Sequence, residues 1–279
     1  MKKETVKYKT PITYYGGKQR IAKWILQYIP KHKIYCEPFF GGGAVFFSKQ
    51  PSYLEAINDI NDNLINFYIQ IQTNFEKLAT AIHNTLHSES MLRNAVAMYN
   101  GQKIGTDIEK AVATWLVFNE SWNASARAGW KFDKGYGGSH YAIVLHHARN
   151  NFCPWLKERL ANVQISCRDA LQVIEDRDSQ DTFFYLDPPY PETNQGHYAG
   201  YTFDDLEKLL VKLETIKGKF ALSNYPAEII DVYARKNNWQ LKQLTIKKDV
   251  NMARVHGSRK TEILLMNYKI SIPHQGEIF

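Results

Sequence analysis

The sequence predicts an α/β fold in which a doubly wound, mostly parallel sheet is interrupted by a mainly helical insertion. The first observation is a set of short apolar segments of strand length, at residues 34–36, 53–57, 182–186 and 220–222. The second is that helical patterns alternate with these segments, which is typical of a βαβ sheet. The third is the long segment 64–158, whose patterns are helical. We therefore expect residues 1–63 and 159–279 to form one domain around residues 64–158.

Length and charge limit the classes of protein that fit. The chain has 279 residues, which exceeds the roughly 100–200 residues usual for one domain, so a large domain with an insertion, or two domains, is expected. Lys and Arg number 35 against 28 Asp and Glu, a formal charge of +7. This excess favours a polyanionic partner such as nucleic acid, although only weakly, because many enzymes with neutral substrates are equally basic.

The cysteines and histidines predict neither disulfides nor a metal site. Cys36, Cys153 and Cys167 form no Cys-x-x-Cys pair, and the nine histidines have no metal-ligand spacing with cysteine or aspartate. The amino terminus lacks the apolar region of a signal peptide, and no apolar run approaches the roughly 20 residues of a membrane span. We expect a cytoplasmic protein that binds no metal and no membrane.

The first strand, turn and helix have the order of a nucleotide-binding unit. The apolar segment 34–36 precedes a turn over residues 37–43 with three glycines, and a buried helix is expected at 44–47. Glycines let a backbone approach a ligand closely. Asp59 follows the next strand, roughly 20 residues after the turn, where nucleotide-binding folds hold ribose hydroxyls. Two alternatives remain: the glycines form only a tight turn, and Asp59 caps the helix expected at 63–68.

Residues 187–190, Asp-Pro-Pro-Tyr, are the most informative motif in the chain. They follow the buried strand 182–186, so the carboxylate lies where that strand leaves the core. A carboxylate accepts hydrogen bonds from an amino group, the prolines fix the next carbonyl, and the tyrosine offers a stacking face. The motif predicts a pocket for an amino-bearing nucleobase. The alternative is a plain strand-to-loop turn.

The second half continues the alternation of helix and strand. Thr202 and Asp205 have the spacing of a capping box, leucines then recur at helical spacing until Gly218, and a strand at 220–222 stops near Asn224. Parallel strands place their carboxyl ends at one edge, where ligands bind. Five segments should meet there, those of Gly41, Asp59, Asp169, Asp187 and Asn224. Asn224 is either a contact to the base or a turn residue.

The insertion should carry the nucleic-acid contacts. Helices are expected at 74–86, 91–99 and 106–118, followed by a loop or hairpin at 119–140 that is rich in glycine, aromatic and basic residues. Such side chains intercalate, contact base edges and hold phosphates. The candidate DNA-binding residues are Trp122, Asn123, Arg127, Trp130, Lys131 and Lys134. The alternative is a surface loop with structural tryptophans.

Taken in order, these motifs resemble the Dam-type DNA adenine-N6 methyltransferases. In that family a cofactor motif precedes a target-recognition segment, which precedes Asp-Pro-Pro-Tyr. Residues 14–18, 59–61 and 165–170 resemble three further family elements that contact the cofactor, whereas the insertion does not align. The resemblance implies catalytic roles for Asp187, Pro188, Pro189 and Tyr190. It implies cofactor-binding roles for Tyr14, Lys18, Glu37, Pro38, Phe39, Phe40, Gly41, Gly42, Gly43, Asp59, Ile60, Asp169, Ala170 and Asp187.

The resemblance implies a Rossmann-like class I methyltransferase fold with an inserted target-recognition domain. The implied reaction is transfer of a methyl group from S-adenosyl-L-methionine to N6 of an adenine flipped out of double-stranded DNA. The chain would work as a monomer or weak dimer, and both a restriction-modification role and an orphan or phage-borne role stay open. Alternatives are methylation of cytosine N4, of an RNA adenine or of a protein glutamine, and a noncatalytic DNA-binding homologue.

Overall fold

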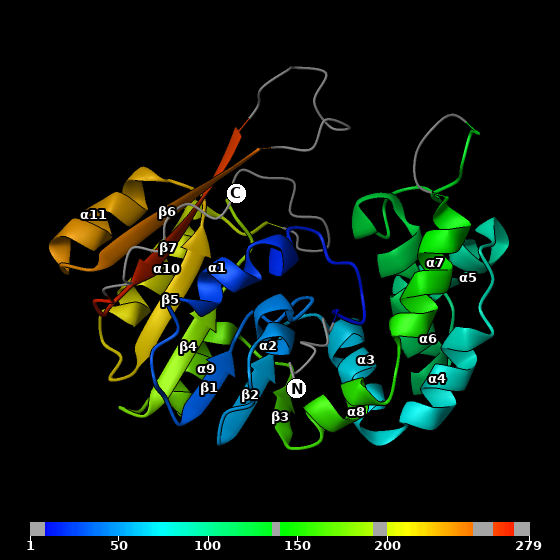
Figure 1. The fold of residues 1–279 in the computed structure, drawn as a ribbon, viewed down its shortest axis with the longest axis horizontal. Helices are drawn as coiled ribbons and strands as arrows, with labels where there is room; N and C mark the ends of the chain where they lie inside the picture. Colours follow the sequence, from blue (N-terminus) through cyan, green and yellow to red (C-terminus); the bar gives the residue numbers. More distant parts are fainter. Residues whose placement is uncertain (1–8, 136–139, 192–199, 248–258, 271–279) are drawn as a thin grey trace, which may run out of the picture.

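A single seven-stranded sheet organises the computed structural model, which describes residues 9–135, 140–191, 200–247 and 259–270. Its strand order is β3-β2-β1-β4-β5-β7-β6 (Figure 1). β1 to β5 are parallel, and β7 runs antiparallel to both β5 and β6. The strands are β1 Ile34–Glu37, β2 Leu54–Asn58, β3 Val163–Ser166, β4 Thr182–Leu186, β5 Lys219–Asn224, β6 Gln240–Lys247 and β7 Arg259–Met266. The predicted mostly parallel α/β sheet is confirmed.

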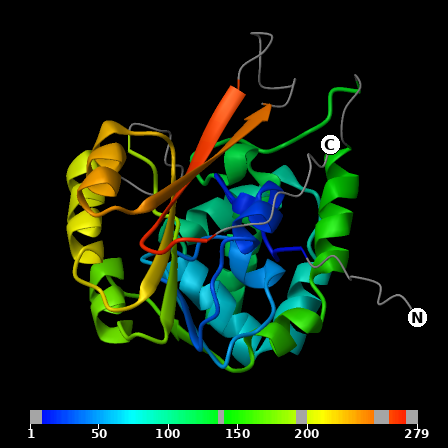
Figure 2. The ribbon, with the colours of Figure 1, turned by 60° about the vertical axis from the view of Figure 1, so that its left-hand side comes forward.

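Helices cover both faces of the sheet. α9 (Ala170–Arg177), α10 (Phe203–Leu213) and α11 (Glu228–Lys236) pack on one face, as Figure 2 shows. The short η1 (Lys18–Arg20), α1 (Ala22–Leu26) and α2 (Ala44–Ser48) lie on the other. β4 is buried along its whole length, which explains why segment 182–186 is continuously apolar rather than alternating.

The insertion between β2 and β3 is helical, as predicted. It consists of α3 Asp62–Thr73, α4 Phe75–His83, α5 Glu89–Tyr99, α6 Asp107–Glu120, η2 Trp122–Ala124, α7 Tyr141–Asn151 and α8 Trp155–Leu160, and it lies beside the β3 edge (Figure 1). The expected helices at 74–86, 91–99 and 106–118 correspond to α4, α5 and α6. Side-chain caps fix three starts, with Asn61, Ser88 and Thr106 accepting hydrogen bonds from the first turns of α3, α5 and α6.

The insertion and the sheet share one hydrophobic core. α6 is buried nearly all round, and its Trp115 indole donates to the Pro11 carbonyl at 3.1 Å. Phe118 of the same helix stacks on Tyr14 with ring centroids 5.2 Å apart. The segment that precedes α1 is therefore fixed against the insertion, and the Tyr14 ring lies against the glycine turn after β1.

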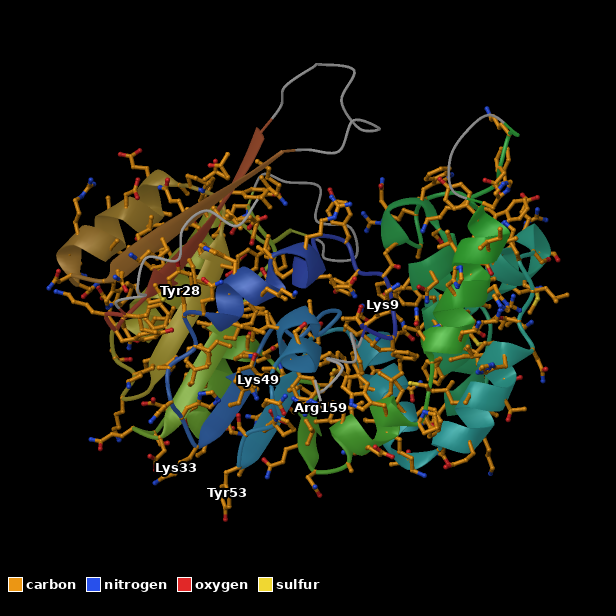
Figure 3. All side chains as sticks on the ribbon, viewed as in Figure 1. Lys9, Tyr28, Lys33, Lys49, Tyr53 and Arg159 are labelled. Carbon is orange, nitrogen blue, oxygen red and sulfur yellow. The ribbon has the colours of Figure 1, made fainter. Side chains whose placement is uncertain are left out.

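A buried ionic cluster joins the last helix of the insertion to the sheet. Arg159 of α8 and Lys49 both donate to the Glu55 carboxylate, and each of the three side chains is at most 6% exposed. Figure 3 labels Lys49 and Arg159, which approach Glu55 from different segments. The Arg159 guanidinium also lies 3.5 Å from the centroid of the Phe46 ring. The cluster ties α2, β2 and α8 together.

The helix after the Asp-Pro-Pro-Tyr motif begins as predicted and ends early. Thr202 and Asp205 form the capping box of α10. α10 stops at Leu213, five residues before the Gly218 at which we expected its end. The Asp178 carboxylate accepts hydrogen bonds from the backbone of Lys217 and Gly218 at 2.9 Å, and these bonds fix a turn in place of further helix.

The described part of the chain has neither a membrane-spanning helix nor a group of side chains suited to a metal ion. None of its helices has the length and apolarity needed to cross a membrane. No three His, Cys, Asp or Glu side chains within the described residues are grouped so that they could hold a metal ion.

Candidate active site

The predicted site segments meet where the parallel strands of the sheet end, at their carboxyl ends. Because β1 to β5 are parallel, Glu37, Asn58 and Ser166 end neighbouring strands, and Leu186 and Asn224 end the next two. The glycine turn, Asp59, Asp169 and the Asp-Pro-Pro-Tyr motif all follow directly from these ends. The topology thus brings together segments that are up to about 180 residues apart in the sequence.

The glycine turn is held by side chains of the protein itself. Gly41 and Gly43 have φ values of +50° and +64°, a region that disfavours other residues. Asp59 Oδ2 accepts from the Gly41 amide at 2.8 Å, and the Tyr68 hydroxyl donates to the Gly41 carbonyl at 2.9 Å. A Cβ on Gly41 would lie 2.8 Å from the Tyr14 ring. The turn therefore needs glycine partly because Tyr14 lies against it.

Asp59 is buried beneath this turn. It is 1% exposed, and its Oδ1 accepts from the Asn61 amide at 3.0 Å. Asn61, rather than Asp59, caps α3, so the capping alternative for Asp59 is wrong. The carboxylate holds the end of β2 to the glycine turn, and its contact with a ribose stays a prediction.

Asn58 is a structural residue that the sequence did not single out. Its amide donates to the carbonyls of Pro38 and Arg168 at 3.0 and 2.9 Å. Its Oδ1 accepts from Ser166 Oγ and from the Arg168 amide at 2.8 and 3.0 Å. All its bonding capacity is used, and it joins the loops after β1, β2 and β3. The sequence signal that could have identified it is an asparagine at the end of an apolar strand segment, directly before Asp59.

The other expected cofactor residues divide into exposed and buried ones. Ile60 is 62% exposed, and Asp169 is exposed while its Oδ1 caps α9 through the Leu171 amide at 2.9 Å. Phe39 is half-buried and meets Tyr201 edge to face. Pro38, Phe40 and Ala170 are buried supports. A half-buried aromatic ring, an exposed apolar side chain and an exposed carboxylate thus follow the carboxyl ends of β1, β2 and β3.

Glu37 is fully enclosed at the end of β1. Its carboxylate accepts a hydrogen bond from the Tyr35 hydroxyl. Burial raises the pKa of Glu37 to about 8, because the charged form is poorly solvated there. It lies beneath the glycine turn rather than on the surface of the site.

Asp187 forms an ion pair with Lys18. The Lys18 ammonium lies 2.8 Å from Asp187 Oδ1 and also donates to the Gly16 carbonyl at 3.0 Å. The Lys18 side chain is 6% exposed, whereas that of Asp187 is 21% exposed. Burial raises the pKa of Asp187, and the Lys18 charge opposes that rise. Lys18 therefore contacts the Asp-Pro-Pro-Tyr motif, and its contact with the cofactor stays a prediction.

Tyr190 lies between Asp187 and Glu262, a residue of the antiparallel strand β7. Its hydroxyl is 3.3 Å from Asp187 Oδ1 and 2.9 Å from Glu262 Oε2. The Lys18 ammonium is 4.8 Å from the Tyr190 ring centroid, and Tyr225 meets the ring edge to face at 4.5 Å. The ring is only 9% exposed. A planar ligand could stack on this ring only by displacing a neighbouring side chain.

Three residues near this ring were missed or left open by the sequence. Glu262 on β7 is 2% exposed and pairs with Lys260 at 2.8 Å. Lys260 also lies 4.5 Å from the Tyr225 ring centroid. Asn224 Oδ1 accepts from the Tyr225 amide at 2.7 Å, which is the turn role, while its buried Nδ2 has no hydrogen-bond partner. Nothing in the local pattern of β7 identified Glu262.

The segment after α6 is a short hairpin. Ser121 and Trp130 form an antiparallel bridge, flanked by hydrogen bonds from Trp122 N to Gly129 O and from Lys131 N to Glu120 O, both 3.0 Å. Asn123 and Ala124 have positive φ values of 53° and 50°. Residues 136–139 of the predicted 119–140 segment lie outside the described residues.

The six candidate DNA-binding residues differ in their exposure and in their hydrogen bonds within the protein. Trp122, Asn123, Arg127 and Lys134 are exposed. Trp130 donates its indole N–H to Glu120 Oε2 at 3.2 Å. Lys131 donates to the Asn119 carbonyl at 3.0 Å, and burial lowers its pKa. The first four are available to a ligand, whereas Trp130 and Lys131 hold the hairpin because their polar atoms are already bonded within the protein.

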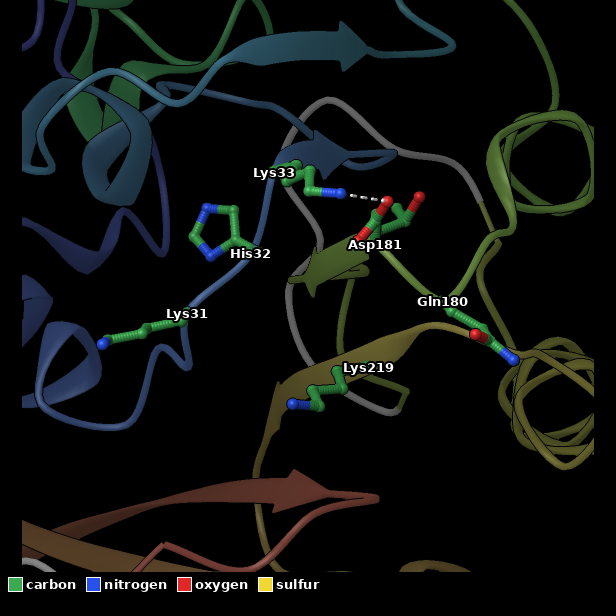
Figure 4. A pocket seen from close by; sticks show the side chains of 7 residues that line it. Lys31, His32, Lys33, Gln180, Asp181 and Lys219 are labelled. Carbon is green, nitrogen blue, oxygen red and sulfur yellow. Dashed lines mark hydrogen bonds and ion pairs between the residues drawn. The ribbon is translucent and has the colours of Figure 1, made fainter.

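A cavity of about 270 Å³ lies at the amino ends of the parallel strands, opposite to the candidate active site (Figure 4). It is lined at the amino ends of β1, β4 and β5 by residues that include His32, Lys33, Asp181 and Lys219. Lys33 and Asp181 form an exposed ion pair at 3.0 Å. The His32 ring is bonded to Pro30 O and Ser52 Oγ. This cavity is remote from Asp187 and is not part of the candidate active site.

Comparisons with known proteins agree with these motifs. A family model described as D12 class N6 adenine-specific DNA methyltransferase matches residues 14–247. A DNA N-6-adenine-methyltransferase of Escherichia phage P1 is 31% identical over 211 residues, which are 72% of this chain but only 27% of the phage protein. The type II methyltransferase M.MjaIII of Methanocaldococcus jannaschii is 26% identical over 91% of this chain and 96% of its own.

A solved structure, the rRNA methyltransferase aviRa from Streptomyces viridochromogenes, overlaps 89% of this chain and 84% of its own. Its identity is 12% and its TM-score 0.33. A TM-score this low carries no argument about the fold, which the strand order itself defines.

Proposed function

The chain belongs to the D12 class N6 adenine-specific DNA methyltransferase family, and we propose that it methylates N6 of an adenine rotated out of duplex DNA. S-adenosylmethionine would be the donor. The observation that carries the proposal is the Asp187 carboxylate at the end of β4, partly exposed and next to the Tyr190 ring. A carboxylate beside an aromatic ring suits an amino-bearing base.

The residues that follow the carboxyl ends of β1, β2 and β3 fit a methyl donor that carries a nucleoside. The glycine turn has no side chains at residues 41–43 to keep a ligand away from its backbone, Ile60 offers an exposed apolar surface, and Asp169 offers a carboxylate oxygen. We propose that these residues hold the base and ribose, with Asp59 fixing the turn from below. S-adenosylmethionine, when bound, supplies an electrophilic methyl group on a sulfonium centre.

On the other side of the site, this chain's residues would orient the amine. Asp187 and the Pro188 carbonyl accept the two amino hydrogens of adenine, which directs the nitrogen lone pair toward the methyl group. The nitrogen would gain the methyl group as that group's bond to sulfur breaks and leaves the bonding pair on sulfur, and it would release a proton to Asp187, whose pKa is raised by burial. Alignment of the two reactants supplies most of the rate, so positioning groups matter more than a strong base.

In the proposed reaction, Lys18 must yield its position to the base. Its ammonium both pairs with Asp187 and lies over the Tyr190 ring. These are the two interactions that the adenine amino group and ring would make. We propose that Lys18 holds the carboxylate ionised and oriented until the base enters.

Replacing Lys18 by methionine is expected to move the acid limb of the pH–rate profile to higher pH. The Asp187 carboxylate must be ionised to accept amino hydrogens, so activity falls as the pH falls through its pKa. Removing the lysine removes the largest cause that opposes burial and raises the pKa of Asp187 further. Initial rates measured across a pH series for both proteins test this. An acid limb at unchanged pH would contradict the role of Lys18, and donor affinity is measured separately by calorimetry.

Residues 64–158 would act as the target-recognition domain, with the hairpin facing DNA. Replacing both Arg127 and Lys134 by alanine is expected to weaken DNA binding and to reduce the salt slope of log K by about 2, because two phosphate contacts are lost. Fluorescence anisotropy with duplex DNA at several salt concentrations measures this. A matched loss of two charges, Lys33→Ala with Lys219→Ala at the opposite edge, should leave the slope unchanged. Equal slopes in the two double variants would contradict a hairpin contact.

The proposed reaction is tested by its product. Purified protein is incubated with unmethylated plasmid DNA and S-adenosylmethionine, and the DNA is digested to nucleosides for mass spectrometry. N6-methyladenine is expected. N4-methylcytosine alone, or no methylated base with the donor bound, would contradict the proposal.

A further inference from the structure

β7 contributes a buried acid to the candidate active site from the far end of the chain. Glu262 is 2% exposed, and its Oε2 accepts a hydrogen bond from the Tyr190 hydroxyl at 2.9 Å. Burial raises the pKa of Tyr190 well above its ordinary value, so the hydroxyl remains a donor. A buried carboxylate is costly unless it is paired, and Lys260 pairs with it at 2.8 Å.

The same strand contacts both aromatic rings beside Asp187, Tyr190 and Tyr225. Lys260 lies 4.5 Å from the Tyr225 ring centroid. Tyr225 in turn meets Tyr190 at a centroid distance of 4.5 Å and an interplanar angle of 74°. Glu262 therefore holds the Tyr190 ring through its hydroxyl, whereas Lys260 is the residue that lies against the Tyr225 ring.

The phenol of Tyr190 has one proton and two carboxylates within reach. Its oxygen is 2.9 Å from Glu262 Oε2 but 3.3 Å from Asp187 Oδ1. A tyrosine hydroxyl can donate only once, and the shorter bond takes the proton. Without Glu262, the phenol would turn to Asp187 and compete there with the amine of the base.

We infer that Glu262 is a positioning residue of the methyl-transfer site, which holds the Tyr190 ring in place and keeps its hydroxyl off Asp187. This inference rests on the proposed function. It assigns Glu262 no contact with the substrate. The effect of Glu262 must therefore pass through the hydroxyl of Tyr190.

The test is a double-mutant cycle of Glu262→Ala and Tyr190→Phe. Single-turnover rates are measured with unmethylated plasmid DNA and tritiated S-adenosylmethionine, both saturating. Glu262→Ala is expected to slow transfer by about 10- to 100-fold, as a misplaced reactant does. In the Tyr190→Phe background the same change should alter the rate by less than about twofold, because the hydroxyl that Glu262 controls is gone.

Controls separate positioning from folding. Thr261→Val changes the neighbouring residue, whose hydroxyl contacts Thr245 instead, and should behave as wild type. Glu262→Gln keeps an acceptor for the phenol and should retain most of the rate, which also covers the case in which the alanine variant does not fold. Donor affinity, measured by calorimetry, should be unchanged in Glu262→Gln and Glu262→Ala.

Three results would overturn the inference while the wild-type protein is active. These are a wild-type rate in Glu262→Ala, an equal loss in the Tyr190→Phe background, and a glutamine variant as slow as the alanine variant. A wild-type protein that makes no N6-methyladenine would instead overturn the proposed function, and the inference with it.

Discussion

Replacing Asp187 by alanine is expected to lower methyl transfer by about 10³-fold or more, the scale on which losing a preorganised polar group at a reacting centre slows an enzyme. The variant loses the acceptor for the amino hydrogens. It also leaves the Lys18 ammonium, 2.8 Å away in the wild type, without its partner next to the Tyr190 ring. Binding of the donor should be largely kept, because the glycine turn is held by Asp59 and Tyr68 rather than by Asp187.

The measurement is the single-turnover rate on plasmid DNA, together with donor affinity by calorimetry. Asp181→Ala is the matched control, since Asp181 precedes β4 at the amino end of that strand and forms an exposed ion pair with Lys33. That variant should transfer methyl groups normally. Methylation by Asp187→Ala at a rate near wild type would contradict the assignment of the site.

Replacing Glu55 by alanine is expected to lower the free energy of unfolding by about 3–5 kcal/mol, because it leaves buried cations without their acceptor. Lys49 and Arg159 are 6% and 4% exposed, so neither is well solvated after the change. Urea denaturation measures the effect. Glu89→Ala removes an exposed ion pair with Arg93 and should cost less than about 1 kcal/mol. Similar losses in the two variants would contradict a special role for the buried cluster.

The contribution of Glu55 should also depend on pH. Burial raises its pKa, but the hydrogen bonds from Arg159 and Lys49 outweigh burial, so the pKa is lowered from its ordinary value of 4.5. A carboxylate whose pKa is lowered in the folded state stabilises the fold fully at pH values above its ordinary pKa. It loses that effect as the pH falls through the lowered pKa of the folded state. The stability difference between wild type and Glu55→Ala should therefore be largest near neutral pH and shrink in acid.

The sequence predicted the features that depend on local pattern. The buried strand 182–186, the glycine turn and the capping box of α10 each follow from the order of a few neighbouring residues, and the structure has all three. The early end of α10 was not predictable in this way. It depends on Asp178, a residue about 40 positions away that bonds the turn at Gly218.

The same division holds in the candidate site. The order of the motifs along the chain was enough to predict the fold class and the family. It also predicted that the motifs meet, because parallel strands bring their carboxyl ends to the same side of a sheet. Only the tertiary structure decided that Lys18 pairs with Asp187, that Glu262 holds Tyr190, and that Trp130 and Lys131 turn inward. Side-chain partners across a sheet depend on register and burial, which no local pattern contains.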